Sequence, residues 1–473
     1  MAGCRVADAK ERRSYSVRSL LVTLAFTFAL VSRLGLAEVS YSALCRIQPI
    51  NFEGWQAQQL GNRWVTLTIV PQLGGRLMQV ALGDHPYLFV NPKLKGKYSP
   101  PSEGRAATQW YNFGGDKLWP LPEGEGDEQH WPGPISDALD AGNYSFKVLS
   151  QGAVCTVRLE GPPDPQTGLQ YSREISLNGD SPEISFHAVM KNVSGHASRW
   201  SMQSVTQYDT AVAQSADTYN REFRAFAPMN LRSAYDDGYR VRLGPANDPA
   251  YSAKDGLFVL HYLYLEREVW LDATDGWLAV VDGAAGYAMV ERFSHSEAEY
   301  PGKATVIFYT NGPALEFNDK GIPFLTSSNP AEMPYYMEAE VNSPMVRLNP
   351  GETYALDTHW FPTRSGGDLE TVTDAGVVTK ALTAATSHEQ ILLSGSFGVF
   401  FPGSLTAYLF DGQGVRTGIV LLQTVSPLDG VDVHKMIPAS PGTARISIHL
   451  IDEYGADRGA LGEASISKVE RAP

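Results

Sequence analysis

Residues 111–134, YNFGGDKLWPLPEGEGDEQHWPGP, combine aromatic and charged side chains in a stretch rich in glycine and proline. The glycines and prolines predict turns rather than a regular strand. Tryptophan is costly to leave in water and charge is costly to bury, so a loop that carries both is typical of a binding surface. A sugar suits such a surface, because its C–H faces stack on indole rings and its hydroxyls need polar partners. The candidate aromatic platform and polar rim are Trp110, Trp119, Trp131, Asp116 and Lys117.

The same loop contains His130, which is a candidate general acid because histidine titrates near neutrality. In that role it would donate a proton to the ring oxygen of a sugar. Gly114 and Gly115 predict a positive φ or a close backbone approach. A second interpretation stays open, in which the tryptophans cap the end of a β-sandwich, the Asp-Lys pair is a local ion pair and His130 is solvated.

Residues 335–344, YYMEAEVNSP, carry two carboxylates in an alternating segment. Side chains two apart in a strand share a face about 7 Å apart, so Tyr336, Glu338 and Glu340 lie together. The opposite face is apolar and must lie on the core. Two like charges at this spacing raise the pKa of one of them, which suits proton transfer. The segment is therefore either an exposed acidic face or a site where carboxylates hold sugar hydroxyls and Glu338 acts as a base.

Short alternating runs bounded by Gly, Pro, Asn and Asp dominate the sequence that must position these residues. In NRWVTLTIVPQLGG, residues 62–75, Val65, Leu67 and Ile69 fall on one face. Each run predicts a half-buried strand, and helical periodicity is scarce after residue 37. So many strands predict an all-β fold, with a large antiparallel β-supersandwich followed by a small β-sandwich. The polar, glycine-bearing stretch 366–376 is the predicted linker between domains 38–365 and 377–473.

The first 37 residues predict a signal peptide, and hence export to the periplasm or the outside. Arg12, Arg13 and Arg18 precede an apolar run over 20–31, and small residues follow at 35–37. An uncleaved anchor is the alternative. Cleavage leaves 32 Lys and Arg against 50 Asp and Glu, a net charge of −18. This acidic balance argues against nucleic acid and anionic membranes as partners, and the mature chain has no predicted transmembrane segment.

The mature chain keeps two cysteines, Cys45 and Cys155, which form one disulfide if the compartment is oxidising. Two cysteines make neither a disulfide scaffold nor a metal site, and no Cys/His cluster has zinc spacing. The sequence also lacks a phosphate loop and a Gly-Xaa-Ser-Xaa-Gly nucleophile motif. No metal or cofactor is expected.

Three stretches resemble the galactose-mutarotase-like superfamily, the β-supersandwich of the aldose epimerases. They are VPQLGGRLMQVALGDH (70–85), FGGDKLWP (113–120) and YYMEAEVNSPMVRLNPGETYALDTHW (335–360). The resemblance implies a domain over roughly residues 48–365 that recognises a sugar. On this pattern Glu338 aligns with the glutamate that acts as general base in the epimerases. Arg76 takes the place of a polar residue that lines the family's sugar site.

The sequence departs from the family's pattern at the histidines that serve there as general acids. Phe113 stands at the first position, and the central segment RWSMQSVTQYDT (199–210) offers Gln203 and Gln207 at the second. Glutamine hydrogen-bonds a ring oxygen but has no acidic proton to transfer. The resemblance therefore implies sugar binding, with Gln207 among the ligands, more directly than it implies epimerase chemistry.

These features predict an exported carbohydrate-binding protein with a mutarotase-like site for a mono- or oligosaccharide and weak aldose 1-epimerase-type activity. One alternative is a non-catalytic scaffold or adaptor of the cell envelope whose C-terminal β domain holds the partner. A third interpretation is a glycan-cleaving enzyme that uses Glu338 with Glu340 or Asp116. Carboxylates side by side on one strand seldom flank a bond from opposite sides, which disfavours that third interpretation.

Overall fold

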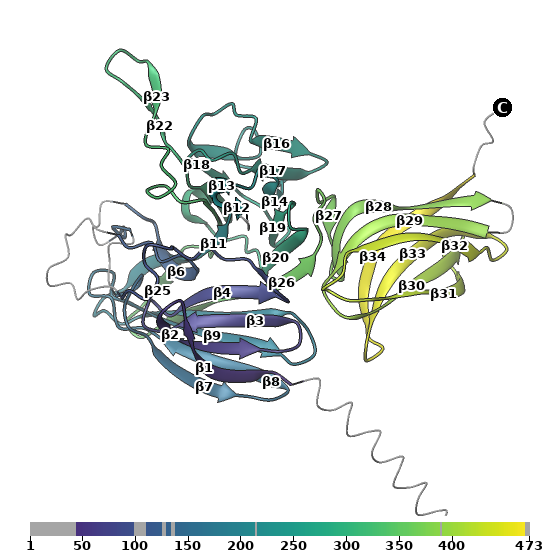
Figure 1. Cartoon of the computed structure of the whole chain (residues 1–473), viewed down its shortest axis with the longest axis horizontal. Coiled ribbons are helices and arrows are strands. Elements are labelled where there is room, and N and C mark those ends of the chain that lie inside the picture. The colour runs from purple at the N-terminus through teal and green to yellow at the C-terminus, as the bar shows by residue number, and fades with distance from the viewer. Residues whose placement is uncertain are drawn as a thin grey trace, which may run out of the picture. The chain divides into compact units, whose positions relative to one another are not determined.

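Strands make up nearly all the regular structure of the described residues (Figure 1). Besides strands, the described part contains one short 3₁₀ turn, η1 (Pro301–Lys303). The predicted signal peptide lies outside the described residues, and so does part of the aromatic loop. The computed structural model describes residues 44–98, 110–124, 129–133, 138–212, 215–387 and 390–468.

The first sheet is antiparallel and carries most of the residues that the sequence singled out. Its strands, in spatial order, are β1 (Arg46–Phe52), β2 (Trp55–Gly61), β3 (Val65–Val70), β4 (Arg76–Leu82), β6 (Asp116–Leu121), β11 (Ser198–Asp209), β24 (Tyr336–Asn342), β21 (Val306–Thr310), β18 (Arg267–Leu271) and β15 (Arg240–Leu243). Two short strands extend it, β5 (His85–Pro86) beside β4 and β25 (Val346–Leu348) beside β11.

The second sheet is also antiparallel. Its strands, in spatial order, are β16 (Tyr251–Lys254), β17 (Leu257–His261), β14 (Phe223–Pro228), β19 (Trp277–Asp282), β20 (Tyr287–Phe293), β26 (Thr353–Arg364), β10 (Ile184–Asn192), β9 (Leu169–Asn178), β8 (Val154–Glu160) and β7 (Ser145–Ser150). Two hairpins stand apart from both sheets, β12 (Ala211–Val212) with β13 (Ser215–Tyr219) and β22 (Leu315–Phe317) with β23 (Pro323–Leu325).

The hydrophobic core lies between these two sheets. Met337, Ala339 and Val341 of β24 belong to the same buried cluster as Ile175 and Phe186 of the second sheet. Burying one such aliphatic side chain contributes about 1.5–3 kcal/mol relative to leaving it exposed. A slip of one residue would turn the two glutamates of β24 into this core, so the register is strongly fixed. The predicted division of β24 into an apolar and a carboxylate face is confirmed.

The C-terminal strands form a further sheet, whose buried apolar side chains belong to one cluster together with residues of the second sheet such as Phe226 and Phe361. In spatial order they are β31 (Arg416–Val425), β30 (Gly403–Asp411), β33 (Thr443–Asp452), β34 (Asp457–Lys468), β28 (Gly376–Ser387), β29 (Gln390–Val399) and β32 (Val431–Pro438), with β27 (Thr371–Val372) beside β28. The all-β class and the large sandwich followed by a smaller β unit are confirmed. The described residues from Leu44 onward belong to one compact unit, and the predicted domain boundaries stay a prediction.

The segment that leads into the site contains two glycines with positive φ, 92° at Gly114 and 72° at Gly115. A Cβ atom at Gly114 would lie 2.1 Å from the carbonyl oxygen of Phe89, so a side chain does not fit there. Both features were predicted for these glycines. The turn prediction for the residues that follow was wrong, because Asp116–Leu121 form strand β6, which pairs with β11. Pairing with β11 outweighs the turn preference of Pro120.

A disulfide joins Cys45 and Cys155, whose Cα atoms are 5.8 Å apart. It connects the start of the described chain to β8 of the second sheet. Within the described ranges, no helix is long and apolar enough to cross a membrane.

Candidate functional site

A cavity of about 650 Å³ lies on the face of the first sheet that is turned away from the core. Strands β6, β11, β24, β21, β18 and β15 contribute its floor and walls, and the loop 122–124 and the turn at η1 contribute its rim. Such a volume is typical of a small-molecule site.

Cross-strand register brings the polar residues of the cavity floor together. Directly paired residues of antiparallel strands point to the same face, so each row of pairs forms a line of neighbouring side chains. One row runs Gln207, Glu338, Tyr309, Glu268. The next row runs Lys117, Val205, Glu340, Ile307, Trp270.

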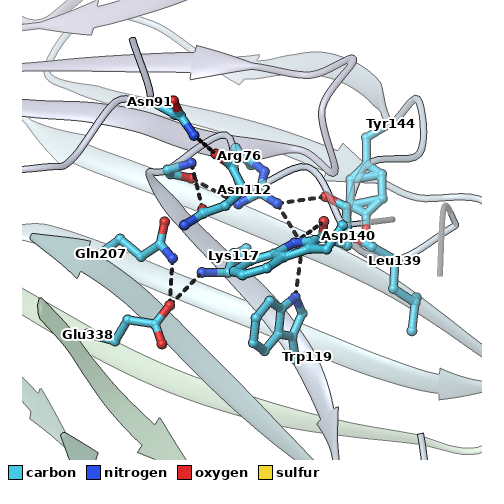
Figure 2. Close-up of polar contacts among 12 residues, drawn as sticks. Arg76, Asn91, Asn112, Lys117, Trp119, Leu139, Asp140, Tyr144, Gln207 and Glu338 are labelled. Carbon is cyan, nitrogen blue, oxygen red and sulfur yellow. Dashed lines mark hydrogen bonds and ion pairs between the residues drawn. The ribbon is translucent and has the colours of Figure 1, made fainter. Parts of the chain in front are cut away.

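Glu338 is held on one side only. Lys117 Nζ lies 3.3 Å from its Oε1, and Gln207 Nε2 donates to the same oxygen at 2.6 Å. Figure 2 shows these two nitrogens converging on one carboxylate oxygen while the other points away from both. In the described part of the chain no group donates to Oε2, so this oxygen is free for a ligand. The carboxylate lines the cavity although Glu338 is only 6% exposed.

Lys117 is the buried cation of the site. Its side chain is fully buried, and it lies 4.5 Å from the ring centroid of Trp119. Burial lowers the pKa of Lys117, and the neighbouring Glu338 carboxylate opposes this effect. Lys117 does not line the cavity, and its contact with the site is through Oε1 of Glu338.

Glu340 lies on the same face as Glu338 but has a different environment. Its Oε2 accepts a hydrogen bond from the Gln203 amide, and no cation is in contact with it among the described residues. Burial and the charge of Glu338 raise the pKa of Glu340 well above its usual value. The two carboxylates of β24 are therefore inequivalent, one paired with a cation and the other with a neutral amide.

Trp110 and Trp119 form an aromatic wall of the cavity. Their ring centroids are 6.1 Å apart in an edge-to-face arrangement. Asp140 fixes both rings, because it accepts hydrogen bonds from Trp119 Nε1 at 3.0 Å and Trp110 Nε1 at 3.2 Å. The same carboxylate accepts a hydrogen bond from Arg76 (Figure 2). The indole N–H groups are thus satisfied inside the protein, and both rings line the cavity.

The opposite wall comes from β18 and β15. Trp270 Nε1 donates to Glu268, and the guanidinium carbon of Arg242 lies 4.8 Å from the Trp270 ring centroid. Burial raises the pKa of Glu268. A ligand in the cavity therefore meets indole rings on two sides and carboxylates on the floor. This combination matches the apolar faces and hydroxyl rim of a sugar.

Four of the residues predicted from the sequence line the cavity: Trp110, Trp119, Glu338 and Glu340. Two more, Lys117 and Gln207, lie beneath it and contact Glu338. Gln207 is fully buried, so it positions the base candidate, whereas direct contact with a sugar had been expected.

Asp116 was predicted to lie beside Lys117 at the rim, and this prediction was wrong. Consecutive residues of a strand point to opposite faces, so Asp116 of β6 points between the sheets. There it forms a bidentate ion pair with Arg173 of β9, with N–O distances of 2.8 and 3.0 Å. Both groups are buried, and the pair joins the two sheets.

Arg76 and Trp131 are also too deeply buried to contact a ligand in the cavity, contrary to expectation. Arg76 has no exposed surface, and its guanidinium donates to Asp140 Oδ1 at 2.6 Å and to the carbonyl oxygen of Gly114 at 2.9 Å. Trp131 is equally buried and lies behind Trp119, with ring centroids 5.3 Å apart. Both residues support the aromatic wall from behind.

His130 does not line the cavity around Glu338. It lines a neighbouring depression together with His196 and Glu299. The structure therefore does not bring the predicted acid and the predicted base together.

Sequence reasoning missed several residues of the site. No sequence pattern marks Asp140 as a site residue, because it lies in a turn before β7 that resembles no motif. The sequence gives a weak indication for Glu268 and Trp270. They are two residues apart in an alternating strand, as Glu338 and Glu340 are, so their side chains share one face. Among the described residues, no cluster of three or more His, Cys, Asp or Glu is arranged to hold a metal ion.

No protein-family model matches the chain, and no curated protein matches it. Solved structures similar to it include a galactose mutarotase-like protein from Clostridium acetobutylicum, at 10% identity and a TM-score of 0.41 over 68% of this chain and 99% of that one. Another is a galactose mutarotase-like protein from Lactobacillus casei, at 11% identity and a TM-score of 0.41 over 67% and 100%.

A TPR-domain containing protein from Parabacteroides distasonis is similar at 14% identity and a TM-score of 0.43. The match covers 69% of this chain and spans about half, 54%, of that protein. The names of the first two structures agree with the superfamily that the sequence motifs resemble. At these TM-scores the likeness carries no inference about activity, so function must be argued from the side chains of this cavity.

Proposed function

We propose that this is an exported carbohydrate-binding protein whose sugar site is the cavity around Glu338, with weak aldose 1-epimerase-type activity. One observation carries the proposal: a buried carboxylate is anchored through one oxygen and presents the other to a cavity walled by indole rings. Polar atoms fixed in this way give orientation, and the rings give contact area, which is the usual division of labour in a small-molecule site.

The export part of the proposal rests on two independent features. The N-terminal arginines, apolar run and small residues have the order of a signal peptide. The disulfide between Cys45 and Cys155 suits an oxidising compartment such as the periplasm or the extracellular space.

The activity part rests on the chemistry of anomer exchange. The reaction needs a base that takes the proton of the anomeric hydroxyl and an acid that protonates the ring oxygen. Glu338 suits the base, because the Lys117 ammonium stabilises its ionised form. Its free oxygen is the atom that would accept the proton.

The test of binding is calorimetric titration of the purified protein with a panel of free monosaccharides, including amino and uronic derivatives. The proposal predicts that at least one sugar binds and that Glu338→Gln weakens this binding. Glu291→Gln is the matched control, because Glu291 is an equally buried glutamate of β20 outside the cavity lining. Binding of every sugar unchanged in Glu338→Gln would remove this cavity from consideration.

A scaffold role for the C-terminal β unit is the second candidate. Ile419 and Leu421 of β31 are 58% and 69% exposed, and Met436 of β32 is 46% exposed. Exposed apolar side chains of this size favour contact with another protein. If the scaffold role is correct, replacing Ile419 and Leu421 by serine should abolish co-sedimentation with the cell envelope. Sugar binding by this double variant should stay intact whichever of the two functions is correct.

A further inference from the structure

The two glutamates of β24 have opposite electrostatic surroundings although they share one face of one strand. Glu338 Oε1 lies 3.3 Å from the Lys117 ammonium and also accepts a hydrogen bond from an amide. Glu340 accepts a hydrogen bond from the neutral Gln203 amide instead. Residues two apart on a strand are about 7 Å apart, close enough in a poorly solvated cavity for one charge to suppress the other.

All the charged groups that shift the pKa of Glu340, except Lys117, favour its neutral form. Glu338, Glu268 and Glu123 all raise the pKa of Glu340, and burial does so most strongly. Lys117 opposes them, but its contact is with Glu338. Arg242, the other cation of the cavity, packs against Trp270. The cation beside Glu338 and the neutral amide beside Glu340 therefore favour Glu338 as the base and Glu340 as the acid.

The competing proton donors are less suitable. The phenol of Tyr309 already donates to Glu266 at 3.2 Å, and burial raises the pKa of Tyr336 well above 10. Lys117 donates to Glu338 from beneath the cavity floor, and His130 lines a different depression. An arginine does not release its proton in a protein, which excludes Arg242.

We propose that Glu340 is the general acid of this site and acts together with Glu338 as the base. The inference rests on the proposed function and deepens it. The anomeric hydroxyl and the ring oxygen of a sugar are bonded to the same carbon, so an acid and a base on one face of a strand reach both at once.

The step balances without a cofactor. The Glu338 carboxylate takes the proton of the anomeric hydroxyl, the bond between C1 and the ring oxygen breaks, and the ring oxygen takes the proton of Glu340. The open-chain aldehyde rotates about the C1–C2 bond. On ring closure at the other face, the ring-oxygen hydroxyl returns its proton to Glu340, and Glu338 gives its proton back to the carbonyl oxygen. Nothing is oxidised, and the product is the other anomer.

The test is exchange NMR between the α and β anomers of D-glucose, D-galactose, D-mannose and D-xylose, with binding measured in the same samples. Wild-type protein should accelerate exchange for a sugar that it binds, and the rate should fall as the pH rises through the raised pKa of Glu340. Glu340→Gln should lose about 100-fold or more in rate, the usual contribution of a general acid. Its residual rate should lack the alkaline fall. The isosteric amide still accepts from Gln203, so binding should change less than about threefold.

The outcomes separate the inference from the proposed function. Binding without accelerated exchange would refute Glu340 as the acid and leave a sugar receptor. A Glu340→Gln variant that accelerates exchange as fast as wild type would also refute Glu340 as the acid and leave an anomer-exchanging enzyme that uses another proton donor. An alkaline fall that vanishes in Glu123→Gln, while Glu340→Gln keeps it, would assign the proton to the rim carboxylate instead. Failure of all four sugars and their derivatives to bind would remove the proposed function itself, and the inference with it.

Discussion

Replacing Lys117 by methionine leaves the Glu338 carboxylate buried without its cation. The Lys117 side chain is fully buried, the Glu338 side chain is 8% exposed, and Nζ and Oε1 are 3.3 Å apart. At an effective dielectric constant near 20, two unit charges at this distance attract by about 5 kcal/mol. Breaking one partner of a buried pair costs about 3–5 kcal/mol, so Lys117→Met should lower the free energy of unfolding by that amount.

The double variant Lys117→Met/Glu338→Gln removes both charges and should recover most of the loss, because no uncompensated charge stays in the cavity floor. Urea unfolding of the wild type, both single variants and the double variant at neutral pH gives the coupling energy. We expect about 3 kcal/mol. A coupling energy below about 0.5 kcal/mol would mean that Lys117 does not stabilise the charge of Glu338, and the assignment of Glu338 as base would lose its physical reason.

Three further predictions concern stability and selectivity. Burial raises the pKa of Glu291 to about 8, so its contribution to stability is full below about pH 4.5 and is lost as the pH rises to about 8. In urea unfolding across this range, Glu291→Gln should remove a slope of about 1.4 kcal/mol per pH unit, and an unchanged slope would contradict the raised pKa. Replacing Cys45 and Cys155 by alanine opens a loop of 110 residues. The free energy of unfolding should fall by about 4–5 kcal/mol, because the unfolded chain gains conformational freedom. An unchanged free energy of unfolding would contradict this effect of the disulfide on the unfolded chain. Above about pH 7, where the Glu123 carboxylate ionises beside Glu338, D-glucuronate should bind at least about tenfold more weakly than D-glucose in calorimetry. Equal affinity would refute this charge argument.

The face of β24 could be predicted from the sequence because it depends only on local alternation. Tyr336, Glu338 and Glu340 alternate with apolar residues, and the structure turns them to the cavity. The all-β class followed in the same way from many short alternating runs. Glu338 as a site residue also depended on the motif around it, which the register of β24 between β11 and β21 now places at the cavity floor.

What the sequence could not predict depends on pairing between distant segments. Asp116 and Lys117 were read as neighbours on a loop, but pairing of β6 with β11 sends them to opposite faces of a sheet. Arg76 has the right chemistry for a sugar site, yet the buried Asp140 occupies its guanidinium. Glu268 reaches the cavity only through the order β24, β21, β18, which no local pattern contains.

The most direct test of the sugar site is a crystal structure of the protein soaked with the sugar that binds most tightly in the calorimetric panel. The account predicts a pyranose ring between Trp119 and Trp270, with a hydroxyl within hydrogen-bond distance of Glu338 Oε2 and the ring oxygen near Glu340. A sugar bound elsewhere on the protein, with this cavity empty, would contradict it.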